Sequence, residues 1–177
     1  MKVPDKPWMH DSEMKLIMYF LSPEDIMLEW GCGGSTVLFS QRVKEYYSIE
    51  HNKEWHEQVT KKVKDKNFKN VHTYFVPSEV ENPIVPSKKE DYKTYIEYPK
   101  VIGKKYDRIL IDGRARQFCS EFCIPYLNKG GLVFFHDFWM NERGRYRDVA
   151  LKHYNEVASI VSTNQTLVIL QPKQYIQ

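Results

Sequence analysis

The residues best suited to chemistry follow the first apolar run of the chain. That run ends in the carboxylate of Glu29, and a glycine-rich turn, Gly31-Cys32-Gly33-Gly34, comes directly after it. The next apolar run ends in a second carboxylate, Glu50. Glycines let a ligand approach the backbone closely, and the distal acid can accept hydrogen bonds from a ribose. This pattern indicates a nucleotide-type cofactor site in an open α/β sheet; a tight turn that needs glycine is the plainer alternative.

The order of the glycines distinguishes between cofactors. A dinucleotide site reads Gly-x-Gly-x-x-Gly and binds a pyrophosphate at the N-terminus of the following helix. The turn in this chain lacks the third glycine in that register, which argues against NAD. The candidate cofactor-binding residues lie at the ends of predicted strands or open the next helix: Glu29, Gly31, Gly33, Gly34, Ser35, Glu50, His51, Ser78 and Asp112.

Two later apolar runs also end in polar residues. Asp112 follows one of them, and His136 and Asp137 follow the other. Ligands bind at the carboxyl ends of the strands in such sheets, so these side chains should meet the glycine-rich turn. A carboxylate placed there can take the proton of an attacking hydroxyl. Asp112 is the first candidate for this base. His136 and Asp137 could form a base and its orienting partner, or His136 could be a buried, hydrogen-bonded histidine.

Charged residues beside Asp112 extend this candidate site. Arg114 and Arg116 could hold an anionic or polyhydroxylated substrate through their forked donors. Alternatively, Arg114 pairs with Asp112 as a structural ion pair. Asp112 and Asp137 could also share a divalent ion, Mg²⁺ or Mn²⁺.

The apolar pattern predicts alternating strands and helices. The expected strands are 26–30, 45–50, 70–75, 107–112, 132–136, 157–162 and 166–171. The expected helices are 11–21 (with Asp11 or Ser12 as N-cap), 35–43, 53–64, 115–127 and 142–153. The last two strands are joined by a short turn and form a hairpin, so one strand must be antiparallel. We therefore predict one α/β domain over residues 1–177, with a Rossmann-like, doubly wound seven-stranded sheet that is mostly parallel and has one antiparallel strand near the C-terminus.

Residues 77–100 interrupt this alternation. Three prolines are followed by a charged piece rich in tyrosine, which includes Tyr92 and Tyr95. A connection of this length is either functional or mobile. We interpret it as a lid on the substrate side that carries a short helix, with Tyr92 and Tyr95 as candidate substrate contacts.

The composition limits the class of protein. The chain has 177 residues, of which 42% are hydrophobic and 28% charged, so it is neither disordered nor a membrane protein. No apolar run reaches the roughly 20 residues that span a bilayer, and the N-terminus has no signal core. A net charge of +3 is too small and dispersed for a typical nucleic-acid protein. Three cysteines, with Cys119 and Cys123 one helical turn apart, indicate buried reduced thiols and a cytoplasmic protein.

Five β-α units followed by an antiparallel hairpin resemble class I S-adenosylmethionine (SAM)-dependent methyltransferases. The resemblance covers about residues 10–171, and Glu29 to Ser35 is similar to the first motif of that family, an acid followed by Gly-x-Gly. It implies that Glu29 lies near the methionine amino group, that Glu50 binds both ribose hydroxyls, and that Asp112 faces the sulfonium methyl group. The Asn/Asp-Pro-Pro-Tyr/Phe motif of amino-methylating members is absent, which favours a hydroxyl acceptor.

Three motifs, Leu-Glu-Trp-Gly-x-Gly-x-Ser-Thr, Ile-Asp-Gly-Arg-Ala-Arg and His-Asp-Phe, narrow the resemblance. They are similar to small methyltransferases linked to glycan modification, among them the methyltransferase domain of an algal-virus glycan-building protein that decorates rhamnose. The implied activity is methyl transfer from SAM to a sugar hydroxyl, in the host cytoplasm for a viral source. The alternatives are a small-phenol or RNA methyltransferase, a nicotinamide-dependent oxidoreductase, and a cofactor-binding module without turnover.

Overall fold

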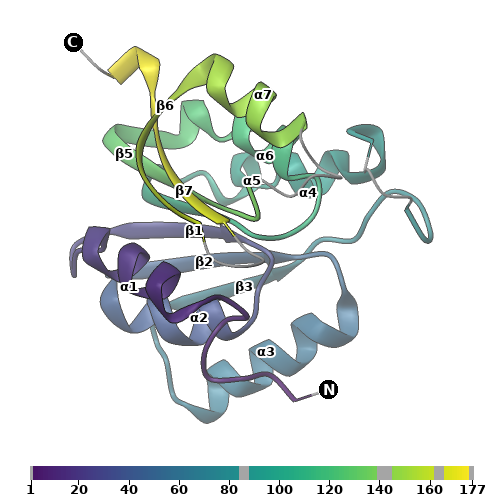
Figure 1. Cartoon of the computed structure of the whole chain (residues 1–177). Helices are drawn as coiled ribbons and strands as arrows, with labels where there is room; N and C mark the ends of the chain where they lie inside the picture. The colour runs from purple at the N-terminus through teal and green to yellow at the C-terminus, as the bar shows by residue number, and fades with distance from the viewer. Residues whose placement is uncertain (1, 84–87, 139–144, 162–165, 176–177) are drawn as a thin grey trace.

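The computed structural model describes residues 2–83, 88–138, 145–161 and 166–175 (Figure 1). Its strands form one seven-stranded sheet in the order β3-β2-β1-β4-β5-β7-β6. The strands are β1 (Ile26–Trp30), β2 (Glu45–Glu50), β3 (Val71–Phe75), β4 (Tyr106–Ile111), β5 (Leu127–His136), β6 (Tyr154–Val161) and β7 (Thr166–Pro172). Strands β1 to β5 pair in parallel, and β7 runs antiparallel to both β5 and β6. The predicted sheet, mostly parallel with an antiparallel strand near the C-terminus, is confirmed.

Helices cover both faces of this sheet. They are α1 (Asp11–Phe20), α2 (Gly34–Phe39), α3 (Lys53–Asp65), α4 (Lys93–Glu97), α5 (Pro99–Ile102), α6 (Arg116–Phe122) and α7 (Arg145–His153). Figure 1 shows α1, α2 and α3 on one face of the sheet and α4 to α7 on the other. Because both faces are covered, the central strands are apolar on both sides, as the nearly continuous runs in the sequence indicate.

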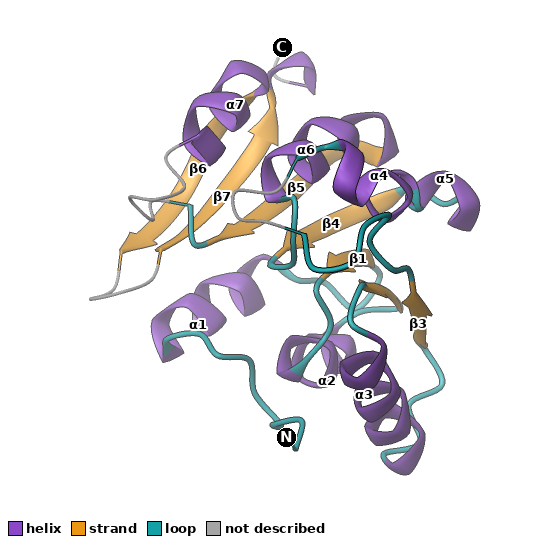
Figure 2. Cartoon of the chain, turned by 90° about the vertical axis from the view of Figure 1, so that its right-hand side faces the viewer, coloured by secondary structure: helices purple, strands orange, loops and turns teal. Residues whose placement is uncertain are grey.

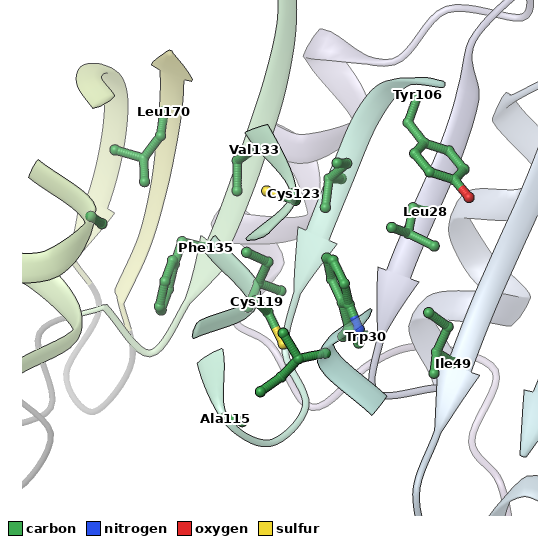
Figure 3. Close-up of a cluster of buried hydrophobic side chains, with 14 of the residues drawn as sticks. Leu28, Trp30, Ile49, Tyr106, Ala115, Cys119, Cys123, Val133, Phe135 and Leu170 are labelled. Carbon is green, nitrogen blue, oxygen red and sulfur yellow. The ribbon is translucent and has the colours of Figure 1, made fainter. Parts of the chain in front are cut away.

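The two faces have separate hydrophobic cores. On the α4–α7 face, Trp30 of β1 and Phe135 of β5 belong to one cluster with Cys119 of α6 (Figure 3). On the other face, Met27 of β1 packs in a cluster with Ile17 of α1. Adjacent residues of a strand point to opposite faces, so the same short strands supply side chains to both cores.

The element ends differ from the sequence prediction where a local signal competes with long-range pairing. Leu127, predicted at the end of a helix, begins β5 because it pairs with Tyr106 of β4. Helix α6 ends at Phe122, and a 3-10 turn that contains Pro125, which cannot donate a helical hydrogen bond, follows. The N-cap of α1 is His10 rather than Asp11 or Ser12. The predicted start of the helix at 142 and the centre of the hairpin turn, 163–165, lie outside the described residues.

The segment 77–100 differs from the predicted lid in its second half. A 3-10 turn (Glu90–Tyr92) leads into α4, and Tyr92, Tyr95 and Ile96 are buried in the core on the α4–α7 face. The indole N–H of Trp30 donates a hydrogen bond of 3.0 Å to the carbonyl of Tyr95, which ties α4 to β1. This half of the segment is therefore part of the hydrophobic core, while residues 84–87 lie outside the described part of the chain.

The three cysteines are buried and form no disulfide. None of the helices in the described ranges is long and apolar enough to cross a bilayer.

Candidate functional site

A cavity of about 840 Å³ lies at the carboxyl ends of the parallel strands. The loops that follow β1, β4 and β5 meet between the two helix layers (Figure 2). The cavity brings together most of the predicted site residues: Gly31, Gly33, Gly34, Ser35, Glu50, His51, Asp112, Arg114, Arg116, His136 and Asp137. Segments distant in sequence thus converge where open α/β sheets bind their ligands.

The three glycines of the turn serve different purposes. Gly31 has a φ of +95°, and a Cβ there would lie 2.7 Å from the backbone of Gly113, so this glycine is required by the contact between two loops. A Cβ at Gly34 would overlap the carbonyl of Lys6 in the N-terminal segment. At Gly33 the nearest atom is on the Trp55 ring at 3.7 Å, an ordinary contact. Gly33 is therefore the position where the missing side chain leaves space on the cavity side.

Glu50 fixes the shape of the turn. One carboxylate oxygen accepts the backbone N–H groups of His51 and Asn52, each at 2.8 Å, and the other accepts that of Cys32 at 3.1 Å. A carboxylate offers about four acceptor positions. Three backbone N–H groups use part of this capacity, and acceptor capacity remains for a ligand.

The N-terminal segment forms one wall of the cavity through Pro4, Pro7 and Trp8. Trp8 stacks on Trp55 with ring centroids 5.7 Å apart. The indole N–H of Trp55 in turn donates to the carbonyl of Cys32 at 2.6 Å. The signal in the sequence for this wall is a tryptophan in a proline-rich segment.

Asp112, His136, Arg116 and Asp137 form a charged network at the ends of β4 and β5. The imidazole Nδ1 of His136 lies 2.8 Å from Oδ1 of Asp112. The same Asp112 oxygen lies 3.2 Å from the Arg116 guanidinium, which also donates to Asp137 at 3.1 Å. The nearest partner of the imidazole Nδ1 is thus Asp112 rather than Asp137, whose carboxylate is 3.8 Å away.

The network sets the protonation of its members. Burial acts to raise the pKa of Asp112, but the charge and hydrogen bond of His136, with Arg116, outweigh it, and the pKa is lowered. Burial acts to lower the pKa of His136, but the Asp112 carboxylate outweighs it and raises the pKa to about 10. At neutral pH the pair is therefore an ionised carboxylate beside an imidazolium.

Arg116 is not free to hold a substrate, contrary to the prediction for this residue. Its side chain donates to the carbonyls of Gly113, His136 and Asp112 as well as to the Asp137 carboxylate. It is 7% exposed. Arg114 is exposed at the rim of the same cavity, so it keeps the position of a candidate substrate contact. The structural ion pair with Asp112 is made by Arg116.

The donor atoms for a metal ion are near one another but already bound. Asp112, His136 and Asp137 each offer one ligand atom within 4.8 Å of the others. The guanidinium of Arg116 bridges the two carboxylates, and the Asp112 oxygen also binds His136. This arrangement does not fit a divalent ion, which needs those oxygen lone pairs for itself.

Glu13 is a charged residue of this region that sequence reasoning missed. It is fully buried in the first turn of α1, where its carboxylate accepts the backbone N–H of His10 at 2.8 Å. The same oxygen lies 3.7 Å from Nε2 of His136, so the imidazole lies between two carboxylates. The available signal was an acid on the apolar face of the helix, beside Met14.

Two predicted cofactor residues lie outside the lining of the cavity. Glu29 is fully buried and accepts hydrogen bonds from Thr36 at 2.6 Å and Ser48 at 2.7 Å, so it supports the turn. Its burial, partly opposed by these hydrogen bonds, raises its pKa to about 7. Ser78 donates to the carbonyl of Val80.

The two predicted substrate tyrosines are placed in the core. Tyr95 is fully buried, and Tyr92 is 2% exposed. Tyr92 also reaches a neighbouring cavity of about 750 Å³ near the ends of β2 and β3. Neither tyrosine lines the cavity at the glycine-rich turn, because both rings pack in the core on the α4–α7 face.

The strand order and the position of the cavity define the class of protein. A sheet ordered β3-β2-β1-β4-β5-β7-β6 with an antiparallel β7 and a cavity at the strand ends is the arrangement of class I SAM-dependent methyltransferases. The profile of a family described as a methyltransferase domain matches residues 28–138, from β1 to just beyond β5. The chain therefore belongs to this methyltransferase family. A search of curated proteins finds no similar sequence.

Solved structures of several enzymes share this fold at low sequence identity. Precorrin 8W decarboxylase of Methanobacterium thermoautotrophicum is 17% identical with a TM-score of 0.67, over 97% of this chain and 95% of that one. An rRNA methylase of Streptococcus thermophilus is 12% identical with a TM-score of 0.66, over 94% and 97%. A Streptococcus mutans protein assigned as a methyltransferase, in complex with SAH, is 14% identical with a TM-score of 0.65, over 93% and 99%.

Proposed function

We propose that this methyltransferase transfers a methyl group from SAM to a hydroxyl group of a sugar. The observation that carries the proposal is the position of the Asp112 carboxylate, which lies in the lining of the cavity beside the glycine-rich turn and is held by His136 and Arg116. A hydroxyl acceptor must lose its proton as it is methylated, and a positioned carboxylate can receive that proton.

The cofactor would be held by the turn and by the end of β2. Gly33 leaves space on the cavity side, and Glu50 has acceptor capacity for a ribose hydroxyl. His51 and Trp55 line the same cavity and could flank the adenine. When bound, SAM supplies a methyl group that its sulfonium already activates. The protein's own task is then mainly to orient the acceptor and to receive the proton.

Asp112 suits the role of base better than His136 does. The imidazole has a pKa raised to about 10, so it keeps its proton at neutral pH and serves as a donor to Asp112. A carboxylate with a lowered pKa is a weak base for a free alcohol. However, the acceptor oxygen becomes a strong acid as the methyl group arrives, because a protonated ether is far more acidic than a carboxylic acid. Asp112 can therefore take the proton late in the transfer and release it to water.

The lining of the cavity supports a polyhydroxylated acceptor. Polar side chains such as Asn52, Gln58 and Arg114 face it together with the indole of Trp8, which is 65% exposed. A flat aromatic face beside hydrogen-bonding groups suits a sugar ring. Tyr92 and Tyr95 belong to the core, so they favour neither a sugar nor a phenol as acceptor. The match to a methyltransferase family argues against the alternative of a nicotinamide-dependent oxidoreductase.

The proposal is tested by calorimetry followed by an acceptor screen. We expect SAM and SAH to bind, and methyl transfer to appear with monosaccharides, rhamnose included, rather than with phenols or short RNA. The Asp112→Asn protein should bind SAM and lose turnover. Absence of SAM binding to folded protein would overturn the assignment of the cofactor site. Turnover with RNA or phenols alone would overturn the sugar assignment.

A further inference from the structure

We propose that Arg116 is a built-in counter-ion that takes the place of a divalent metal ion between Asp112 and Asp137. The two carboxylates follow adjacent strands, β4 and β5, and both line the cavity. One guanidinium nitrogen lies 3.2 Å from Oδ1 of Asp112, and another lies 3.1 Å from Oδ2 of Asp137. A single side chain thus bridges the two oxygens that a metal ion would bind.

The backbone around Arg116 is built to hold the guanidinium in this position. Ala115, directly before it, has a φ of +52°, a left-handed conformation that residues with a Cβ rarely adopt. This turn begins α6, and the Arg116 side chain then donates to three backbone carbonyls, those of Gly113, His136 and Asp112. Unfavourable backbone geometry that surrounding contacts maintain is typical of functional sites. The side chain is therefore fixed rather than free to leave.

The charge and geometry of the site disfavour a metal ion while Arg116 is present. Asp112 and Asp137 offer ligand atoms within 4.8 Å of each other. Two carboxylates this close repel each other unless a cation lies between them, and Arg116 supplies that cation. A divalent ion needs several oxygen ligands at about 2.0–2.6 Å from one point. The guanidinium occupies the approach to both carboxylates, and His136 takes a further position on Asp112.

The role of Arg116 in catalysis rests on the proposed function. Its contact with Asp112 helps to keep that carboxylate ionised and fixed within the cavity. Arg116 is thus a positioning residue that acts through Asp112. The same reasoning makes a distinct prediction about metal binding: removal of the guanidinium should free the Asp112 and Asp137 oxygens that it now contacts to bind an ion.

The test is electron paramagnetic resonance of Mn²⁺ with the full chain, without SAM or acceptor. We expect the native protein to leave the signal of free Mn²⁺ undiminished. Arg116→Ala should gain one Mn²⁺ site, with at least tenfold higher affinity than the native protein, and Asp137→Asn in that background should remove it. Arg114→Ala is the matched control, because it removes an exposed arginine of the same cavity, and it should behave as the native protein does.

Two results would overturn the inference. One is stoichiometric Mn²⁺ binding by the native protein that Asp137→Asn abolishes. The other is a folded Arg116→Ala protein that binds no more Mn²⁺ than the native one. If circular dichroism shows that Arg116→Ala does not fold, Arg116→Lys keeps the charge and should also exclude Mn²⁺; a stoichiometric site there would count against the inference. These readouts are independent of methyl transfer, so a failure of the proposed function leaves them interpretable.

Discussion

The carboxylate of Glu50 accepts a hydrogen bond from the backbone N–H of Cys32 at 3.1 Å. This contact joins the end of β2 to the middle of the glycine-rich turn after β1. The other carboxylate oxygen of Glu50 accepts the backbone N–H groups of His51 and Asn52. One buried side chain therefore shapes both loops. The acid therefore has a structural task in addition to the cofactor contact that we propose for it.

Glu50→Gln should weaken SAM binding by about tenfold to a hundredfold. The amide keeps one acceptor oxygen but turns an N–H donor toward backbone donors, and a hydrogen bond to a charged group contributes about 1.5–3 kcal/mol. Isothermal titration calorimetry with SAM measures this. Glu54→Gln is the control, because Glu54 is an exposed acid that lines the same cavity. Equal losses of SAM affinity in the two variants would show that the effect comes from removing a negative charge near the cavity and not from the hydrogen bonds of Glu50.

Alanine substitutions should separate the glycines that the fold needs from the one that the ligand needs. Gly31→Ala meets both a positive φ and the backbone of Gly113, so a loss of about 2 kcal/mol or more in unfolding free energy is expected. Gly33→Ala makes only ordinary contacts with Trp55, so its stability should change by less than about 1 kcal/mol while SAM affinity falls. Urea denaturation and calorimetry measure the two quantities. A Gly33→Ala protein with native affinity would place the cofactor elsewhere.

The strands next to the site could be predicted from the sequence because local signals determine them. The predicted ranges 26–30 and 45–50 match β1 and β2, since each apolar run is followed by turn residues. The start of β5 could not be predicted in the same way. Gly130 and Gly131 look like a helix stop, whereas the pairing of Leu127 with Tyr106 depends on a strand distant in sequence.

The site shows the same division between local and long-range information. The meeting of Asp112 and His136 followed from the rule that strand ends converge, and the structure places them 2.8 Å apart. The identity of the arginine that pairs with Asp112 depends on the left-handed backbone at Ala115, which the residue type does not indicate. Likewise, the burial of Glu13 against His136 depends on how α1 packs against the sheet.

Glu29 should make the stability of the protein depend on pH near neutrality. Its pKa is raised by burial from 4.5 to about 7, so the folded state binds a proton that the unfolded state releases. The stability is fully present below the unfolded pKa and is lost as the pH rises through the folded pKa. The loss amounts to roughly 3 kcal/mol by pH 8.

The Glu29→Gln variant tests this dependence, because a glutamine resembles the protonated acid. We expect it to unfold at higher urea concentration than the native protein at pH 8 and to differ little near pH 5. Glu24→Gln removes an exposed acid and is the control. A Glu29→Gln protein that is less stable than the native one at both pH values would contradict the prediction.

Tyr95 should be a determinant of stability rather than of acceptor choice. Its side chain is fully buried with Trp30 and Ile96 in one cluster, so Tyr95→Ala should cost about 3–5 kcal/mol. Tyr19→Ala, at an 81% exposed aromatic residue, should change stability by less than about 0.5 kcal/mol. Thermal denaturation measures both. Tyr95→Phe should keep the acceptor preference of the native enzyme. A changed preference would indicate that Tyr95 contacts the acceptor.

Asp112→Asn should lower kcat by about 10²–10⁴-fold while SAM affinity stays within a few-fold, because the amide cannot take the acceptor's proton. The pH profile of kcat distinguishes Asp112 from His136 as the base. Asp112 has a lowered pKa, and His136 holds its proton up to about pH 10, so the profile should be flat from about pH 5 to about pH 9. A histidine base with an ordinary pKa would instead give a rise in rate near pH 6.5. Such a rise in the native enzyme, absent from a His136→Gln variant, would make the imidazole the base and would remove Asp112 from that role.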